Sequence, residues 1–202
     1  MSALDFLSVA AAADDGGFRP VAKSSMERAQ REAGARFEER DGWLVPVAIL
    51  GEEQYRESVG VADLSHLAKL EVRPGAAPAG LVTDCYKVWY DVSPRRALVL
   101  SETPQLPSLR EQLADRLVID VTGALGILAI VGPEAKTVIR RLTHLHDFPK
   151  GGEVAHITAH VLNPEPDAYW IVFPQEYGHY LWEVAVDRAT PLGGGPIGVD
   201  AL

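Results

Sequence analysis

The feature that most constrains the fold is a buried-looking apolar run that leads directly into a helix start. Residues 124–132 form this run, and Gly132-Pro133-Glu134 follows with a proline suited to the first helical turn and a carboxylate for the positive end of the dipole. Ala135, Ile139, Leu142 and Leu145 then recur on one face, which predicts an amphipathic helix. A strand followed at once by a returning helix favours a layered fold of sheet and helix.

Strand-like runs and short helices fill the rest of the chain. Alternating or continuous apolar runs predict strands over 69–73, 88–92, 97–100, 117–121, 127–131, 156–162 and 169–173. Helices are expected over 24–34, 52–58, 106–113, 133–145 and 175–186. The first begins with a Ser24–Glu27 capping box and should end at Gly34. This mixture favours an α+β fold, with mixed or antiparallel sheets packed with helices, over a Rossmann sheet.

The length of 202 residues suits one large domain or two small ones. Residues 1–22 read as a loose N-terminal arm, because they are rich in alanine and then run into Asp14-Asp15-Gly16-Gly17 without a sustained period. No internal repeat and no low-complexity linker divides the remainder. We therefore expect a single domain over residues 23–202.

Composition excludes several classes of partner. The formal net charge of -9 argues against nucleic acid and against anionic lipid, since both attract clustered lysine and arginine. The start lacks a basic targeting region, and the longest apolar run is too short to span a bilayer. The single cysteine, Cys85, cannot form an internal disulfide, which fits a reducing compartment. A cytoplasmic protein without a membrane or nucleic-acid partner is expected.

Two motif-like segments do not support a cofactor site. Gly193-Gly-Gly195-Pro-Ile-Gly198 matches G-x-G-x-x-G, but only four residues follow, and a dinucleotide site needs a helix there. His144-Leu-His146-Asp147 has spacing common at helix ends and lacks cysteine ligands. We expect no nucleotide and no metal.

Two segments in the first third have an order of residues that periodicity does not predict. They are 34–46 and 60–72, and the second contains Asp63-Leu-Ser-His66. They resemble the opening of the glycine-cleavage T-protein (aminomethyltransferase) superfamily, and the matching part of sarcosine oxidases and dimethylglycine dehydrogenases. Further segments are similar to later family motifs in the same order, so the likeness spans about residues 23–202: 128–135, 141–143, 167–174, 181–183 and 195–198.

The resemblance implies a fold and a cofactor, tetrahydrofolate, which that family uses to move one-carbon units. It implies cofactor-binding roles for Ser65, His66, Leu67 and Trp43. The family residue matching Leu67 is usually methionine and lies against the folate. For His66 the alternative is a histidine that fixes its turn by hydrogen bonds, and for Trp43 it is a core or interface aromatic.

The sequence also departs from the family. The segment that carries the family's essential acid looks deleted, which leaves Asp84 and Asp91 as the only nearby carboxylates and weak catalytic candidates. Trp170 stands where the family has a glutamate that hydrogen-bonds the pterin, and an indole has one donor and no acceptor. Residues 163–167 replace a tyrosine-containing family segment.

Three functions follow from this pattern. The first is a non-catalytic or co-catalytic subunit of a tetrahydrofolate-linked complex for one-carbon transfer or amine demethylation, resembling the small γ subunit of heterotetrameric sarcosine oxidases. Its partners would be an amine oxidase or the remaining T-protein-like domains. The second is a compact tetrahydrofolate-dependent aminomethyltransferase or demethylase in which Asp84 or Asp91 supplies the acid. The third is a stand-alone folate-binding regulatory protein.

Overall fold

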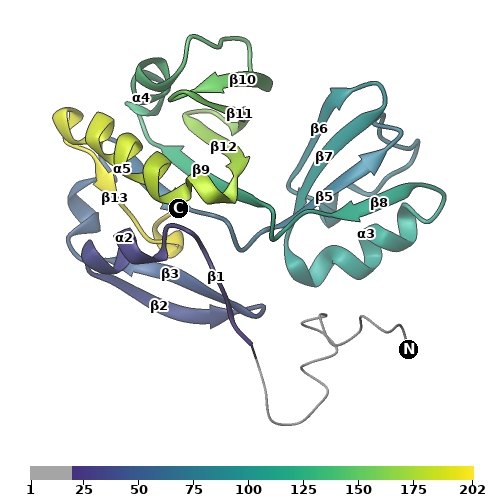
Figure 1. The fold of residues 1–202 in the computed structure, drawn as a ribbon, viewed down its shortest axis with the longest axis horizontal. Helices are drawn as coiled ribbons and strands as arrows, with labels where there is room; N and C mark the ends of the chain where they lie inside the picture. Colours follow the sequence, from purple (N-terminus) through teal and green to yellow (C-terminus); the bar gives the residue numbers. More distant parts are fainter. Residues whose placement is uncertain (1–19) are drawn as a thin grey trace.

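The computed structural model describes residues 20–202 (Figure 1). The predicted N-terminal arm over residues 1–22 falls almost wholly outside the described residues and stays a prediction. Within the described part, the chain begins with a two-residue strand, β1 (Ala22–Lys23), that pairs with Trp43 and Leu44.

A six-stranded sheet forms the larger lobe, drawn at the left of Figure 1. Its order is β10 (Lys150–Val154), β11 (Ile157–Glu165), β12 (Ala168–Pro174), β9 (Leu125–Val131), β4 (Gly60–Asp63) and β13 (Gly195–Pro196). Neighbours are antiparallel except β13, which runs parallel to β4. Helices α4 (Ala135–Leu142) and α5 (Gly178–Ala189) pack through one apolar core with this sheet.

Beside this sheet lies a small three-stranded sheet of β1, β3 (Trp43–Ile49) and β2 (Ala35–Arg40). The short helix α2 (Glu27–Glu32) joins it to α5. The connection from β2 to β3 is a two-residue hairpin turn in which Asp41 and Gly42 both have positive φ. The Asp-Gly pair is the strongest local signal for such a turn, and it makes this hairpin readable from the sequence.

The smaller lobe is a four-stranded antiparallel sheet, drawn at the right of Figure 1. Its order is β6 (Val88–Ser93), β7 (Arg96–Ser101), β5 (Ala68–Arg73) and β8 (Leu117–Asp120). Helix α3 (Leu106–Gln112) covers one face, where Leu109 and Leu113 are fully buried. The opposite face packs against the six-stranded sheet through a shared core that includes Leu98, Leu100 and Ile127.

Burial on both faces explains the apolar run that precedes α4. In β9, Leu128 and Ile130 face the core shared with α4 and α5, while Ile127 and Ala129 face the smaller lobe. A half-exposed strand would alternate with polar residues, but a strand covered on both sides reads as continuously apolar. The apolar run at 124–132 therefore forms a central strand of the six-stranded sheet, as its composition indicates.

The predicted α+β class is confirmed, with mixed and antiparallel sheets. Each predicted strand is present within a few residues at its ends, whereas β1, β2, β3, β4, β10 and β13 were not predicted. The predicted helix over 52–58 is wrong, because only a single 3-10 turn forms over Glu52–Gln54. Residues 175–177 are likewise a 3-10 turn before α5.

Two helix starts differ from expectation. The capping box is wrong: α2 begins at Glu27, and the Ser24 hydroxyl accepts from the Met26 N–H at 3.1 Å instead of capping the first helical turn. Helix α4 begins at Ala135, after the Pro133 turn, and ends before Leu145, which packs against the core from the following loop. Gly34 does follow the first helix with a φ of +81°, as predicted.

No helix within residues 20–202 combines the length and the apolar character needed to cross a membrane. The same residues contain no group of three or more His, Cys, Asp or Glu side chains placed to hold a metal ion.

The C-terminal segment lies tightly against β3. A Cβ on Gly198 would stand 2.2 Å from the Val47 carbonyl oxygen, whereas one on Gly123 would meet nothing within 4 Å. We expect Gly198→Ala to lower the free energy of unfolding by about 1–3 kcal/mol, because the backbone must shift to relieve the overlap. Urea denaturation measures this, with Gly123→Ala as the matched control at about 0.5 kcal/mol or less. Equal stabilities of the two variants would contradict the close approach.

Candidate functional site

The Asp63-Leu-Ser-His66 segment forms the junction between the two lobes. It connects β4 of the six-stranded sheet to β5 of the four-stranded sheet. Its backbone is held by the Leu64 N–H, which donates to the Ile127 carbonyl at 2.9 Å, and by the Leu67 N–H, which donates to the Leu64 carbonyl at 3.0 Å. This family-like segment therefore lies where the chain passes from one sheet to the other.

A buried polar cluster organises the junction. The Asp63 carboxylate accepts from the Gln30 side-chain amide at 2.7 Å and from the Ser65 N–H at 2.8 Å. The Ser65 hydroxyl accepts from the Ile127 N–H at 3.1 Å. The Lys69 ammonium donates to the Ser65 carbonyl at 2.7 Å. These bonds tie α2, β4, β5 and β9 together and satisfy most polar atoms of the cluster, although the Gln30 Oε1 atom is buried without a partner among residues 20–202.

Lys69 is the costly member of this cluster. Its residue is fully buried, and its ammonium lies 5.7 Å from the centre of the Trp43 ring, within the range of a cation–π contact. Burial lowers the pKa of Lys69 to about 8, although the Asp63 carboxylate acts in the opposite direction. The charged form of Lys69 is therefore disfavoured in the folded protein relative to the unfolded chain.

This pKa gives a measurable pH dependence of stability. Because the folded-state pKa of Lys69 lies below its unfolded value, the penalty is complete below pH 8 and is relieved as pH rises between the two values. We expect the unfolding free energy of the wild type, relative to Lys69→Met, to increase by about 1 kcal/mol from about pH 7 to about pH 9. The exposed Lys136→Met serves as control and should show no such trend. A flat difference for Lys69→Met would mean that the ammonium is solvated.

A groove opens on the other side of the junction. A pocket of about 380 Å³ is bordered by His66 and Leu67 of the junction and by Trp170 of β12. An adjoining pocket of about 620 Å³ shares five of its residues, so the two form one continuous groove, here called the junction groove. The shared residues are Lys87, Pro164, Glu165, Trp170 and Leu202.

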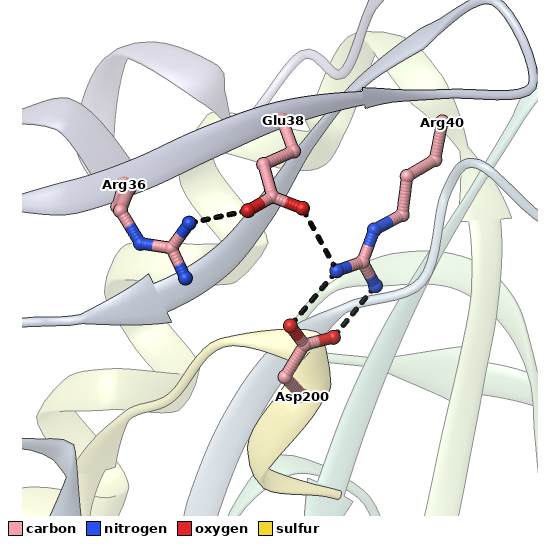
Figure 2. A network of polar contacts seen from close by, with 4 residues as sticks. All are labelled: Arg36, Glu38, Arg40 and Asp200. Carbon is pink, nitrogen blue, oxygen red and sulfur yellow. Dashed lines mark hydrogen bonds and ion pairs between the residues drawn. The ribbon is translucent and has the colours of Figure 1, made fainter.

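An ion-pair network fixes one wall of the junction groove (Figure 2). The Arg40 guanidinium, which also borders the groove, contacts both Asp200 carboxylate oxygens at 2.6 and 2.8 Å. Glu38 lies between Arg40 and Arg36 and accepts from both. Hydrogen bonds from Arg36 and then Arg40 lower the pKa of Glu38, and the bond from Arg40 lowers the pKa of Asp200. The network holds the C-terminal turn, residues 199–201, against β2.

His66 is the most distinctive polar group of the groove. Burial lowers the pKa of His66; the Asp63 carboxylate opposes this effect, and Lys69 and Arg40 add to it. Its Nδ1 atom is buried without a hydrogen-bond partner among residues 20–202. The hydrogen bonds that fix the junction turn come from Asp63 and Ser65 instead.

The residues named from the sequence separate into two groups around the junction. His66 and Leu67 border the junction groove, whereas Ser65 directs its polar atoms into the buried cluster and Trp43 covers Lys69. The sequence analysis did not identify Arg40. The signal was its position within the family-like segment 34–46, directly before the Asp-Gly turn.

The two weak catalytic candidates, Asp84 and Asp91, lie outside the junction groove and are exposed. Asp91 accepts from the Trp89 indole at 2.8 Å. Asp84 borders another pocket of about 310 Å³, which shares Lys87 and Glu102 with the first part of the junction groove. Neither carboxylate reaches His66 or Trp170 through a contact in the described part of the chain.

The carboxylates that do border the junction groove face water. Glu102 pairs with Lys87 at 2.7 Å, and its side chain is 49% exposed. Glu165 and Asp167 are exposed at the β11–β12 turn. Within residues 20–202, no buried carboxylate borders the groove. The groove therefore offers an apolar and aromatic wall, two paired cations and a histidine whose pKa is lowered by burial.

Local sequence matches link the chain to aminomethyltransferases. It is 47% identical over 60 residues to an aminomethyltransferase of Mycobacterium leprae (strain Br4923), covering 27% of this chain and 16% of that protein. It is 47% identical over 57 residues to an aminomethyltransferase of Mycobacterium tuberculosis (strain ATCC 25618 / H37Rv), covering 26% and 16%. The match thus spans about a sixth of the length of these relatives. No protein-family model matches the chain.

Solved structures share the fold over nearly the whole chain. The glycine cleavage system aminomethyltransferase T from Bartonella henselae superimposes with a TM-score of 0.68 at 16% identity, covering 90% of this chain and 60% of that one. A chain of the heterotetrameric sarcosine oxidase from Corynebacterium sp. U-96, in complex with pyrrole 2-carboxylate, superimposes with a TM-score of 0.57 at 13% identity, covering 85% and 96%. The predicted resemblance is confirmed: one segment of the chain is similar in sequence to aminomethyltransferases, and its fold is similar to those of the aminomethyltransferase T and sarcosine oxidase chains.

Proposed function

We propose that this chain acts as a non-catalytic or co-catalytic subunit of a tetrahydrofolate-linked complex that transfers one-carbon units or demethylates amines. The observation that carries the proposal is Trp170, which borders both parts of the junction groove where the resemblance implies a pterin-binding glutamate. The fold and the Asp63–His66 motif are similar to those of the family, but no buried carboxylate among residues 20–202 borders the groove.

The groove residues fit part of a folate molecule. Trp170, Leu64 and Leu67 offer apolar surface for a flat ring. Arg40 and Lys87 offer positive charge for an anionic tail, although each is already paired with a carboxylate. The pterin N–H donors, however, need a buried acceptor, and the groove carboxylates in the described residues are solvent-exposed.

This mismatch favours a contribution to a shared site over a complete one. A pterin buried against an indole would leave donors unpaired at about 1–3 kcal/mol each. A second polypeptide that supplied the acceptor would remove that cost. A general acid must lie within hydrogen-bond reach of the reacting nitrogen, and the carboxylates that border the groove within residues 20–202 face water instead.

The structural relatives support assembly with other subunits. The matched sarcosine oxidase chain is part of a heterotetramer, and it is covered over 96% of its length. The fold of this chain therefore overlaps most of one chain of such an assembly. The chemical partner we propose is an amine oxidase or the remaining T-protein-like domains.

The first test uses the isolated full-length chain. We expect no release of methylene-tetrahydrofolate from an aminomethyl donor, because no buried acid among residues 20–202 borders the groove. Chromatographic detection of the product measures this. Release would overturn the proposal, and Asp84→Asn and Asp91→Asn would then show whether either carboxylate replaces the family's acid.

Calorimetry separates the proposal from a stand-alone folate-binding protein. Titration of the isolated chain with tetrahydrofolate should give at most weak, millimolar binding, since the pterin donors lack acceptors. Micromolar affinity, lost in Trp170→Ala and kept in the exposed Asp91→Asn control, would instead favour the stand-alone binder.

A further inference from the structure

A second pocket, remote from the junction groove, gathers positive charge. It has a volume of about 480 Å³ and lies between the end of α4, the β10–β11 hairpin and α5. Three arginines and two histidines border it, with Glu153 as the one acidic residue: Arg140, Arg141, Arg188, His144 and His156. Because the whole chain carries a net charge of -9, this cluster opposes the charge of the rest of the molecule.

The arginines differ in how far they are already occupied. Arg188 pairs with Asp187, and Arg141 donates to the Arg188 carbonyl at 3.0 Å. Among residues 20–202, Arg140 and Arg141 have no carboxylate partner. Arginines in a last helical turn complement the helix dipole, which applies to Arg140 and Arg141 on α4 and to Arg188 on α5. That effect does not explain why the two helix ends and His156 of the β10–β11 turn border one pocket.

The floor of the pocket is apolar. Leu142, Leu145 and Val184 border it, and the ring of Tyr180, which is 41% exposed, closes one side. A cationic rim over an apolar floor matches an organic anion, in which a charged group is attached to an apolar body.

The hairpin that forms one wall has an unfavourable backbone. Ala155 and His156 form a two-residue turn between the paired Val154 and Ile157, with φ values of +45° and +66°. Such turns favour asparagine and glycine, and alanine and histidine are poor choices for them. Two hydrogen bonds hold Ala155: its N–H donates to the Leu142 carbonyl at 2.7 Å, and its carbonyl accepts from the Tyr180 hydroxyl at 3.1 Å.

Backbone conformations of this kind persist where the surrounding structure enforces them, and they concentrate at functional sites. Here the enforced turn places His156 at the rim beside the arginines. We propose that this pocket binds a small organic anion, in which a phosphate or carboxylate group lies against Arg140, Arg141 and Arg188 and an apolar body packs on Leu145 and Val184. This site is independent of the junction groove and of the function proposed for it.

Calorimetry on the full chain tests the site with defined probes. Phenyl phosphate combines both features, inorganic phosphate lacks the apolar body, and phthalate replaces phosphate with carboxylates. Phenyl phosphate should bind at least about fivefold more tightly than inorganic phosphate, since its ring buries apolar surface. The ratio of phenyl phosphate to phthalate then identifies the preferred anionic group. Absence of binding by all three at millimolar concentration would overturn the proposal.

A matched pair of variants on one helix locates the binding. Arg140→Gln should weaken phenyl phosphate binding about tenfold, the loss expected for one charge-assisted contact. Lys136→Gln removes the same charge from the exposed residue one turn earlier on α4, outside the pocket, and should change affinity less than about twofold. Equal losses in the two variants would show non-specific attraction and contradict the site.

The turn provides a second, independent readout. The double variant Ala155→Asn, His156→Gly installs residues that favour the same backbone. We expect its melting temperature to rise while its affinity for phenyl phosphate falls about threefold or more, because the rim loses a ring donor. A more stable variant with unchanged affinity would show that the turn does not serve binding.

Discussion

The buried pairing of Asp63 and its neighbours is the interaction on which the rest of the structure depends. This carboxylate joins the side chain of Gln30 in α2 to the backbone of the junction, and the Ser65 hydroxyl extends the connection to β9. Lys69 then fastens the first residues of β5 to the same turn. A buried carboxylate that lost these donors would cost several kcal/mol, so the two sheets are held in one arrangement.

The same cluster determines which family-like residues remain available for ligands. Ser65 and Lys69 use their polar atoms for the junction itself, whereas His66 and Leu67 point to the opposite side and border the groove. The motif therefore has two roles: some of its residues stabilise the junction, and others border the groove. Its structural half explains how the fold persists in a chain whose groove lacks a buried acid among the described residues.

The sequence predicted many of the strands and helices well because its strongest signals were local. Apolar runs and the Gly132 helix start are written directly in neighbouring residues, and β9 and α4 follow them closely. The Ser24–Glu27 capping box failed because the backbone of residues 24–26 turns before the helix begins. The groove could be anticipated only at His66, Leu67 and Trp170, whose positions the resemblance marks. Arg40 and Lys87 reach it through long-range pairings that no local pattern contains.

The charges of the two pockets separate their roles. In the junction groove each cation is neutralised by the chain's own acids, Arg40 by Asp200 and Lys87 by Glu102. An anion that entered there would have to displace a carboxylate already in place. In the pocket beside α4, Arg140 and Arg141 carry no such carboxylate within the described residues, and an anion would meet uncompensated charge. Electrostatics thus favours apolar recognition at the junction groove and anion recognition at the second pocket.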